Sequence, residues 1–314
     1  NIDPFVLGLN PHSVFRCRTG FAACSGAQTR PIMGQAADHM PHRGRVGMDL
    51  QLKSKIALVT GSYRGTGRAI AMTMAREGAT TIIHGFDLAA AQAVADEITA
   101  QGGIAHAVAG DILTDTGASA VHEAALKAAG PVDILVNNYG TADAGSWTKS
   151  ETADWVEAYE KNVLSAVRMT RLTMESMKAR GWGRVIMLGT IGSTEPAARM
   201  PHYYASKGAL ATMTVSLAKE LSGTGITVNI VSPGLIRTKE VEDRFIAQGA
   251  AKGWGTTWDE VEPHVLKNFM GNLTGRVTVT QEVADLVAFV ASPLAGSLMA
   301  LNMRIDGGTT ALVV

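Results

Sequence analysis

The sequence contains few cysteines, no long apolar run and no excess of charge of either sign. Its two cysteines, Cys17 and Cys24, both lie within the first thirty of 314 residues. The rest of the chain therefore has no internal disulfide, cysteine metal site or cysteine nucleophile, and a reducing compartment is the simplest interpretation. No stretch reaches the about 18 consecutive apolar residues that a membrane-spanning helix needs. We expect a cytoplasmic protein that does not insert into membranes.

The charged residues balance, with 28 Lys and Arg against 28 Asp and Glu. The net charge therefore does not indicate nucleic acid or an anionic membrane as a partner. With 46% hydrophobic and 18% charged residues, the composition is typical of a globular chain with a sizeable core. The length alone allows one or two domains, because single α/β domains commonly reach about 250 residues.

Residues 1–47 differ from the remainder of the chain. They lack amphipathic periodicity and contain four prolines, and they carry five arginines against only Asp3 and Asp38. An arginine-bearing, acid-poor segment of this kind is typical of a targeting peptide, but a tag or other non-native sequence has the same appearance. We expect an N-terminal extension over 1–47 and one folded domain over 48–314.

From Lys55 onward, short runs rich in β-formers alternate with helical patterns. The strands are expected at 56–60, 80–85, 105–111, 133–138, 184–190 and 227–233, and the first helices at 67–77, 88–100 and 116–129. Repeated βαβ units with right-handed crossovers place helices on both faces of a parallel sheet. The predicted fold is α/β, a doubly wound, Rossmann-like parallel sheet whose ligands bind at the carboxyl ends of the strands.

A glycine-rich turn, TGSYRGTG at 60–67, follows the first predicted strand and opens a helix. A strand that turns sharply into a helix directs free backbone N–H groups and the positive end of the helix dipole toward one point. Gly61, Gly65 and Gly67 would let a pyrophosphate approach that backbone closely. The spacing is G-x-x-x-G-x-G, which differs from the commoner dinucleotide fingerprint.

Five motifs in a fixed order carry a resemblance to a known family. They are the turn at 60–67, NNYG at 137–140, Asn162, Tyr203-x-x-x-Lys207 and Pro233-Gly234. Over about residues 52–310 the chain resembles the short-chain dehydrogenase/reductase family, and in particular its 3-oxoacyl-reductase-like members. The resemblance implies a nicotinamide cofactor and a homodimer or homotetramer with contacts through helices around 152–180 and 203–222.

The same resemblance implies a set of cofactor-binding residues. They are Gly61, Arg64, Gly65, Thr66, Gly67, Asp111, Asn138, Tyr203, Lys207, Pro233, Gly234 and Thr238. Within that set, Asp111 would contact the adenine, and Pro233 to Thr238 would meet the nicotinamide carboxamide. Tyr139 stands where the family usually has alanine, so its ring either borders the cofactor cleft or packs at the sheet edge.

Two features bear on the choice between NADP and NAD. A carboxylate at the end of the second strand would bind the adenosine ribose and repel a 2′-phosphate. Gly85 occupies that position, and Asp87 comes two residues later, where it reaches the ribose only if the loop bends back. Arg64 stands where relatives that prefer NADP carry a basic residue able to pair with the phosphate. NADP is favoured over NAD.

Tyr203 and Lys207 are four residues apart in a run that predicts a helix over 202–221, so they share one helix face. Reduction of a carbonyl needs a proton donor at its oxygen, and the reverse oxidation needs the same group as a base. A phenol has a pKa of about 10, which a nearby ammonium lowers by favouring the phenolate. The resemblance therefore makes Tyr203 the general acid/base and Lys207 the group that tunes it, while Tyr204 lines the pocket or packs.

The family also has a hydroxyl about thirteen residues before the tyrosine, and that count ends at Thr190. Its hydroxyl can hold the substrate oxygen, although Ser193, three residues later, is an alternative. Asn162 matches the family asparagine that orders a proton relay to Lys207. We therefore expect the catalytic residues to be Asn162, Thr190, Tyr203 and Lys207.

A substrate lid is expected at about 239–273, where the βαβ rhythm breaks. Its aromatic residues suggest an apolar or ring-bearing substrate surface, and they include Phe245, Trp254, Trp258 and Phe269, followed by Met270. Six acidic residues in the lid argue against a strongly anionic ligand unless they face solvent. His202 and His264 lack the spacing of a metal site, so we expect a metal-free mechanism.

The resulting hypothesis is an NAD(P)-dependent oxidoreductase that transfers a hydride between nicotinamide and a ketone or secondary alcohol. An alternative is a non-catalytic nucleotide-binding sensor or partner subunit, which the departures at Tyr139 and Thr190 favour. A third possibility is sugar-nucleotide epimerase or dehydratase chemistry, although such relatives usually have a larger C-terminal region. The sequence leaves the substrate open.

Overall fold

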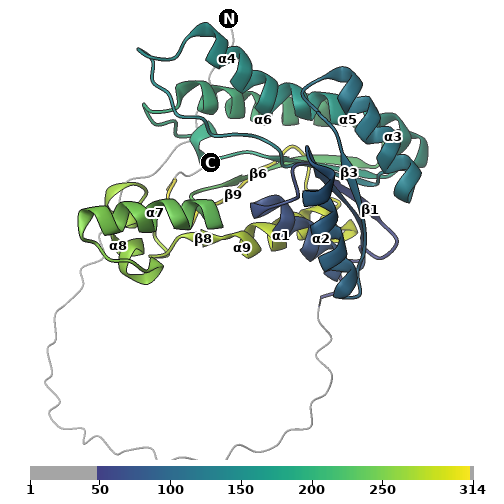
Figure 1. Ribbon diagram of the computed structural model, residues 1–314. Coiled ribbons are helices and arrows are strands. Elements are labelled where there is room, and N and C mark those ends of the chain that lie inside the picture. The colour runs from purple at the N-terminus through teal and green to yellow at the C-terminus, as the bar shows by residue number, and fades with distance from the viewer. Residues whose placement is uncertain (1–47, 312–314) are drawn as a thin grey trace, which may run out of the picture. The chain divides into compact units, whose positions relative to one another are not determined.

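The computed structural model describes residues 48–311, which belong to one compact unit, Met48–Val314 (Figure 1). Its main sheet has seven strands in the order β3-β2-β1-β4-β5-β6-β9, and every neighbouring pair is parallel. The strands are β1 (Ile56–Val59), β2 (Thr80–Gly85), β3 (Ile104–Ala109), β4 (Ile134–Asn137), β5 (Gly183–Leu188), β6 (Ile226–Pro233) and β9 (Asn302–Ile305). The predicted doubly wound parallel sheet is confirmed, and the predictions on residues 1–47 lie outside the described residues.

Helices cover both faces of this sheet (Figure 1). One layer contains α1 (Gly65–Arg76), α2 (Leu88–Ala100) and α9 (Thr280–Ala291), and the other contains α3 (Asp115–Ala129), α5 (Ser165–Arg180) and α6 (Pro201–Glu220). No helix among the described residues is long and apolar enough to cross a membrane.

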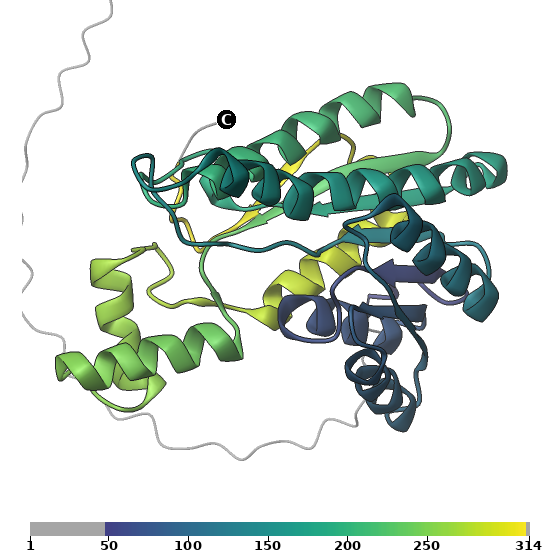
Figure 2. The same ribbon diagram turned by 45° about the horizontal axis from the view of Figure 1, so that its top comes forward.

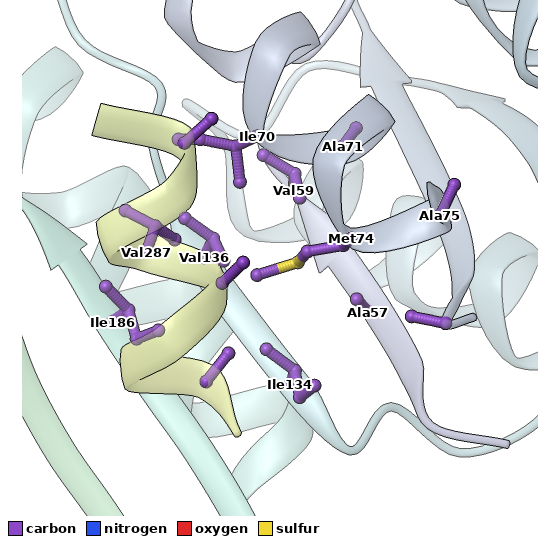
Figure 3. Close-up of a cluster of buried hydrophobic side chains, with 14 of the residues drawn as sticks. Ala57, Val59, Ile70, Ala71, Met74, Ala75, Ile134, Val136, Ile186 and Val287 are labelled. Atoms are coloured by element: carbon purple, nitrogen blue, oxygen red, sulfur yellow. The ribbon is translucent and has the colours of Figure 1, made fainter. Parts of the chain in front are cut away.

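The strands form where the sequence has continuous apolar runs because both faces of the sheet are buried. Figure 3 shows the core between the sheet and α1 and α9, where Met74 and Val287 lie with Val136 and Ile186. All four side chains are almost completely buried. Burial of such a side chain contributes about 1.5–3 kcal/mol, so these layers position the strand ends firmly.

The strand order reverses between β1 and β4, because the chain runs outward through β2 and β3 before it returns beside β1. In open parallel sheets, ligands bind outside the carboxyl ends of the strands at such a switch point. The turn at 60–67 follows β1 and NNYG follows β4, so both motifs lie at this crevice.

The segment expected to form a lid folds into two helices, α7 (Lys239–Lys252) and α8 (Trp258–Asn268), and Figure 2 shows both, in bright green, set apart from the sheet layers. They share a small core that includes Phe245, Trp258 and Val261. A short pair of parallel strands, β7 (Ile236–Arg237) and β8 (Thr278–Val279), joins this part to the domain.

The helix expected around 152–180 is interrupted. The chain forms α4 (Thr152–Tyr159), then a π-helical turn at Glu160–Leu164, and then α5. π-helical turns within helices occur frequently at functional sites, and this turn contains Asn162.

Candidate active site

The phosphate turn, residues 60–67, contains backbone geometry that requires glycine. Gly61 and Gly65 have φ angles of +63° and +56°, in the left-handed region that disfavours residues with a Cβ. A Cβ on Gly67 would lie 2.4 Å from Nδ2 of Asn138 and 2.7 Å from the carbonyl oxygen of Gly61. Each of the three glycines expected at a phosphate site is therefore required at its position, either by its backbone conformation or because no space is left for a side chain.

The phosphate turn is bound to the end of β4 by hydrogen bonds. The Thr60 hydroxyl oxygen accepts from the backbone N–H groups of Asn138 and Tyr139, both at 3.0 Å. In return, Nδ2 of Asn138 donates to the carbonyl oxygens of Thr60, at 2.8 Å, and Gly61, at 3.2 Å. The two motifs that the sequence placed at one site thus form a single rigid unit.

His84, which the sequence analysis did not single out, also fixes this turn. Its Nδ1 accepts from the backbone N–H of Gly61 at 3.0 Å, and its Nε2 donates to the carbonyl oxygen of Gly110 at 3.1 Å. The ring is completely buried, and burial lowers its pKa. An imidazole that accepts at one nitrogen and donates at the other is neutral, so His84 is held uncharged between the ends of β1 and β3.

The phosphate turn has the features of an anion site. No side chain caps the N-terminus of α1. A Cβ built on Gly65 would meet nothing nearer than Cγ2 of Thr238, at 3.9 Å, so the backbone there is open. Free N–H groups at a helix N-terminus stabilise a bound phosphate, and a dinucleotide pyrophosphate fits this cradle.

The groups that bear on cofactor choice are arranged around the end of β2. Gly85 supplies no carboxylate there, and the Asp87 carboxylate caps α2 by accepting from the Ala90 N–H at 2.8 Å. The guanidinium of Arg64 lies 3.1 Å from the carboxylate of Glu240 on α7, and both side chains are more than half exposed. This edge of the site therefore presents a cation in the phosphate turn and no uncommitted carboxylate on the β2–α2 turn.

The Tyr139 ring lies beside the phosphate turn. A Cβ on Gly61 would be 3.3 Å from three atoms of Tyr139, and the tyrosine ring centroid is 5.0 Å from that of Phe86. The ring is half-buried, and burial raises the pKa of its phenol. Asp111, at the end of β3, is exposed and accepts from the Leu113 N–H at 2.9 Å. The tyrosine ring thus packs against the core beside the phosphate turn.

Tyr203 and Thr190 line a cavity of about 990 Å³. Thr190 follows β5, and Tyr203 lies in the first turn of α6. Burial raises the pKa of Tyr203 to about 12, and a hydrogen bond with the Thr190 hydroxyl opposes that rise. Ser193 instead donates its hydroxyl to the Thr190 carbonyl oxygen at 2.7 Å, within the loop. Thr190, and not Ser193, therefore shares the cavity wall with Tyr203.

Lys207 is buried one helical turn beyond Tyr203. Its ammonium donates to the carbonyl oxygen of Leu188 at 2.8 Å, and burial lowers its pKa to about 8. We expected this ammonium to lower the pKa of the phenol. Burial instead dominates and raises the pKa of Tyr203, so the phenol is protonated at neutral pH.

Asn162 and Lys207 meet at Gly140, the last residue of NNYG. A Cβ on Gly140 would lie 2.5 Å from Oδ1 of Asn162 and 2.9 Å from Nζ of Lys207. The asparagine side chain is held by Thr141, whose N–H donates to Oδ1 at 2.9 Å and whose carbonyl accepts from Nδ2 at 3.1 Å. The π-helical turn thus brings Asn162 to the lysine, and only glycine fits between them.

The loop after β6 forms another wall of the cavity, to which Gly234 and Thr238 both contribute. The Gly234 N–H donates to the carbonyl oxygen of Ile305 at 3.1 Å, directly after Pro233 ends the strand. The Thr238 hydroxyl accepts from the Val241 N–H at 3.3 Å and caps α7. The loop backbone is therefore fixed to β9 at one end and to the lid at the other.

The lid lines the cavity with only some of its expected aromatic residues. Phe245, Phe269 and Met270 contribute to the wall. Trp254 and Trp258, which we expected on the substrate surface, instead pack within the small core of the lid. Their large rings supply the apolar area that two short helices need to stay folded, which the sequence alone does not distinguish from a substrate surface.

Comparison with known proteins agrees with this geometry. The family model described as short chain dehydrogenase matches residues 55–249. The oxidoreductase YvaG of Bacillus subtilis is 34% identical, over 83% of this chain and 98% of the relative. The 3-oxoacyl-[acyl-carrier-protein] reductase FabG of Escherichia coli is 32% identical, over 82% and 98%.

A solved structure is similar throughout the domain. L-sorbose reductase from Gluconobacter frateurii, complexed with NADPH and L-sorbose, superposes with a TM-score of 0.79 at 30% identity, over 85% of this chain and all of that one. The family match spans more than half of the chain. The protein therefore belongs to the short-chain dehydrogenase family and is an NAD(P)-dependent oxidoreductase that acts on CH–OH or C=O groups.

Proposed function

We propose that the protein is a carbonyl reductase or secondary-alcohol dehydrogenase in which Tyr203 is the general acid/base. The observation that carries the proposal is that the Tyr203 phenol and the Thr190 hydroxyl both belong to residues that line the same cavity. Two hydroxyls at one point can both bind a carbonyl oxygen, and only the more acidic phenol can exchange a proton with it at a useful rate.

The protonation state of Tyr203 favours the reductive direction. With a pKa of about 12 the phenol carries its proton at neutral pH, so it can donate that proton to the oxygen of a reduced carbonyl. When bound, the nicotinamide supplies the hydride for reduction and, in its oxidised form, a positive charge near the phenol. Thr190 holds the substrate oxygen through its own hydroxyl.

Lys207 and Asn162 act on the proton rather than on the substrate. An ammonium has three donors, and Leu188 uses one of them, so two stay available for the cofactor ribose and a proton relay. Because Asn162 lies beside the ammonium at Gly140, we assign it to that relay. In the occupied site the ammonium would lower the pKa of the phenol through its charge.

NADP is the proposed cofactor. The cation of Arg64 and the lack of a carboxylate at Gly85 both favour a 2′-phosphate, and the capping bond of Asp87 keeps that carboxylate at α2. The similarity to an enzyme solved with NADPH supports the same choice. Asp111, Asn138 and the loop from Pro233 to Thr238 complete the proposed cofactor contacts.

We also propose a homodimer or homotetramer, because large apolar side chains are exposed on and beside the helices that the family uses for subunit contacts. Trp147, Val156 and Val215 have exposed fractions of 73%, 63% and 39%. Sedimentation analysis of the purified chain would test this assembly.

A screen of ketones and secondary alcohols with NADPH, NADH and both oxidised cofactors tests the proposed function. We expect consumption of NADPH with at least one class of ketone, monitored by the absorbance of the reduced nicotinamide. Tight NADPH binding without turnover on any substrate would instead favour a nucleotide-binding sensor or partner subunit.

A further inference from the structure

The cavity wall carries more positive than negative charge. Its charged side chains are Arg199, Arg244 and Glu195, and it has the volume of a site for a sizeable ligand, about 990 Å³. Arg199 comes from the loop before α6, and Arg244 from the lid helix α7 on the far side. Within residues 48–311, neither arginine forms an ion pair, although Arg244 lies over the Phe245 ring at 4.9 Å.

The acidic residues of α7 leave Arg244 without a carboxylate partner on its own helix. Three acidic residues of α7 are each bound to another cation: Glu240 to Arg64, Glu242 to Arg237 and Asp243 to Lys239. These are three of the six acidic lid residues that argued against an anionic ligand, and none of the six is among the residues that line the cavity. The charged side chain that α7 contributes to the cavity wall is the cation Arg244.

The same wall contains a buried hydroxyl whose hydrogen-bonding capacity is unused. Thr310 is only 3% exposed and lines the cavity, and its Oγ1 forms no hydrogen bond with any residue between 48 and 311. Its backbone is fixed, because the N–H donates to the Asp306 carboxylate at 2.9 Å. A buried hydroxyl without a partner is destabilising, and a polar ligand group in the cavity would supply the missing hydrogen bond.

Most of the remaining wall is apolar. Ile191 and Met200 come from the segment between β5 and α6, and Phe245, Phe269 and Met270 come from the lid and the segment after it. Such a wall excludes water from the reacting carbonyl and favours a hydrocarbon portion of the substrate. The arginines, at the exposed edge, would then bind whatever anionic group that portion carries.

We infer that the substrate is an amphipathic anion: a carbonyl compound whose apolar part lies against Phe245 and Phe269 and whose carboxylate or phosphate is bound by Arg244 and Arg199. The inference rests on the proposed function, because it places the carbonyl at Tyr203. It makes the two arginines specificity residues for substrate binding rather than catalytic residues.

Steady-state kinetics on a matched pair of substrates test this assignment. The pair is 5-oxodecanoate and its methyl ester, in which a methyl group replaces the negative charge of the terminal group. We expect the acid to have the lower KM, and R244Q and R199Q each to raise that KM by roughly five- to tenfold, because a partly exposed charged hydrogen bond is lost. The kcat for the acid and both constants for the ester should change little.

K127Q is the matched control, since it removes one positive charge from an exposed site on α3, outside the cavity wall. Equal kcat/KM for acid and ester, or no selective effect of either arginine variant, would overturn the inference while leaving the proposed function intact. Acetoacetyl-coenzyme A separates the two anion sources: a larger arginine effect there than on 5-oxodecanoate identifies a phosphate-bearing substrate.

A binding measurement separates failure of the inference from failure of the proposed function. Calorimetric titration with octanoate and with octanol needs no turnover. We expect octanoate to bind more tightly than octanol. The affinity for octanoate should fall as the salt concentration rises. It should also fall in R244Q but not in K127Q. If no ketone is reduced and octanoate still binds in this way, the catalytic proposal fails and the anion site stands. If octanoate and octanol bind equally, the anion site is refuted.

Discussion

The guanidinium of Arg64 lies 3.1 Å from the carboxylate of Glu240, and this ion pair joins the phosphate turn to the first turn of the lid helix α7. The residue proposed to bind the 2′-phosphate of NADP thus forms an ion pair with the lid. A bound phosphate would compete with Glu240 for the same cation. Binding of the cofactor and the position of the lid are therefore linked through one side chain.

Removal of the Arg64 charge should weaken NADPH binding selectively. We expect R64Q to raise the Kd for NADPH by about tenfold, in the range of one charge-assisted hydrogen bond, and to change the Kd for NADH by less than about twofold. Fluorescence titration with both reduced cofactors measures the two constants. E240Q is the matched control: it frees the arginine, so NADPH should bind equally well or better. Equal losses for both cofactors in R64Q would contradict the assignment.

The buried ring of His84 should make the stability of the fold sensitive to acid. Burial lowers its pKa in the folded state, so between the ordinary value of about 6.5 and the lower folded value the unfolded chain binds more protons. The free energy of unfolding therefore falls as the pH drops through this window, and it is unaffected by His84 above it. Protonation would also remove the acceptor for the Gly61 N–H.

Thermal unfolding of the wild type and H84Q between pH 5 and 8 measures this effect. H84Q should be less stable at pH 8, because the glutamine does not reproduce both ring contacts. The difference between the two proteins should narrow as the pH falls below 6.5. A difference that is constant across this range would show that His84 does not titrate on unfolding.

The hydroxyl of Thr190 should be required while its methyl group is not. We expect T190V, which keeps the shape and removes the hydroxyl, to lower kcat by about 10²-fold, the usual loss for one donor at a reacting oxygen. T190S should retain most of the activity, since it keeps the hydroxyl. Steady-state assays of both variants compare them directly, and S193A is the control for the alternative residue. Loss of activity in S193A with an active T190V would reverse the assignment.

Gly140 should tolerate no side chain. In G140A the new Cβ would lie 2.5 Å from Oδ1 of Asn162 and 2.9 Å from Nζ of Lys207, so both groups must move. We expect a folded protein with kcat reduced at least tenfold, since a small displacement of proton-relay groups is costly. G208A is the control, because nothing lies within 4 Å of a Cβ there and alanine favours the helix. Circular dichroism and turnover of both variants test the difference.

Several parts of the fold follow from the sequence because local pattern and burial agree there. The run of β-formers at 80–85 coincides with β2, which is buried on both faces, and the helix expected at 88–100 coincides with α2. The interruption at Glu160–Leu164 could not be predicted, because it depends on the contact of Asn162 with Thr141, 21 residues earlier.

The candidate site likewise contains residues that the sequence predicts and residues that it does not. Short motifs contain the residues that the sequence identified. Spacing within one helix brings Tyr203 to Lys207, and spacing within one turn brings the turn glycines to each other. His84, Arg244 and Thr310 come from segments without a motif and meet the site only through tertiary packing. His84 could have been noticed as a histidine in an otherwise apolar strand, whereas the raised pKa of Tyr203 depends on burial that only the folded chain reveals.

Turnover by Y203F, measured together with its NADPH affinity, tests the central claim most directly. The variant removes one oxygen atom and keeps the ring, so the fold and the phosphate turn should be unaffected. The account predicts a fall in kcat of at least about 10³-fold, within the range of general acid catalysis, with a Kd for NADPH within about twofold of the wild type. Activity within about tenfold of the wild type would show that another group supplies the proton and would contradict the assignment of Tyr203.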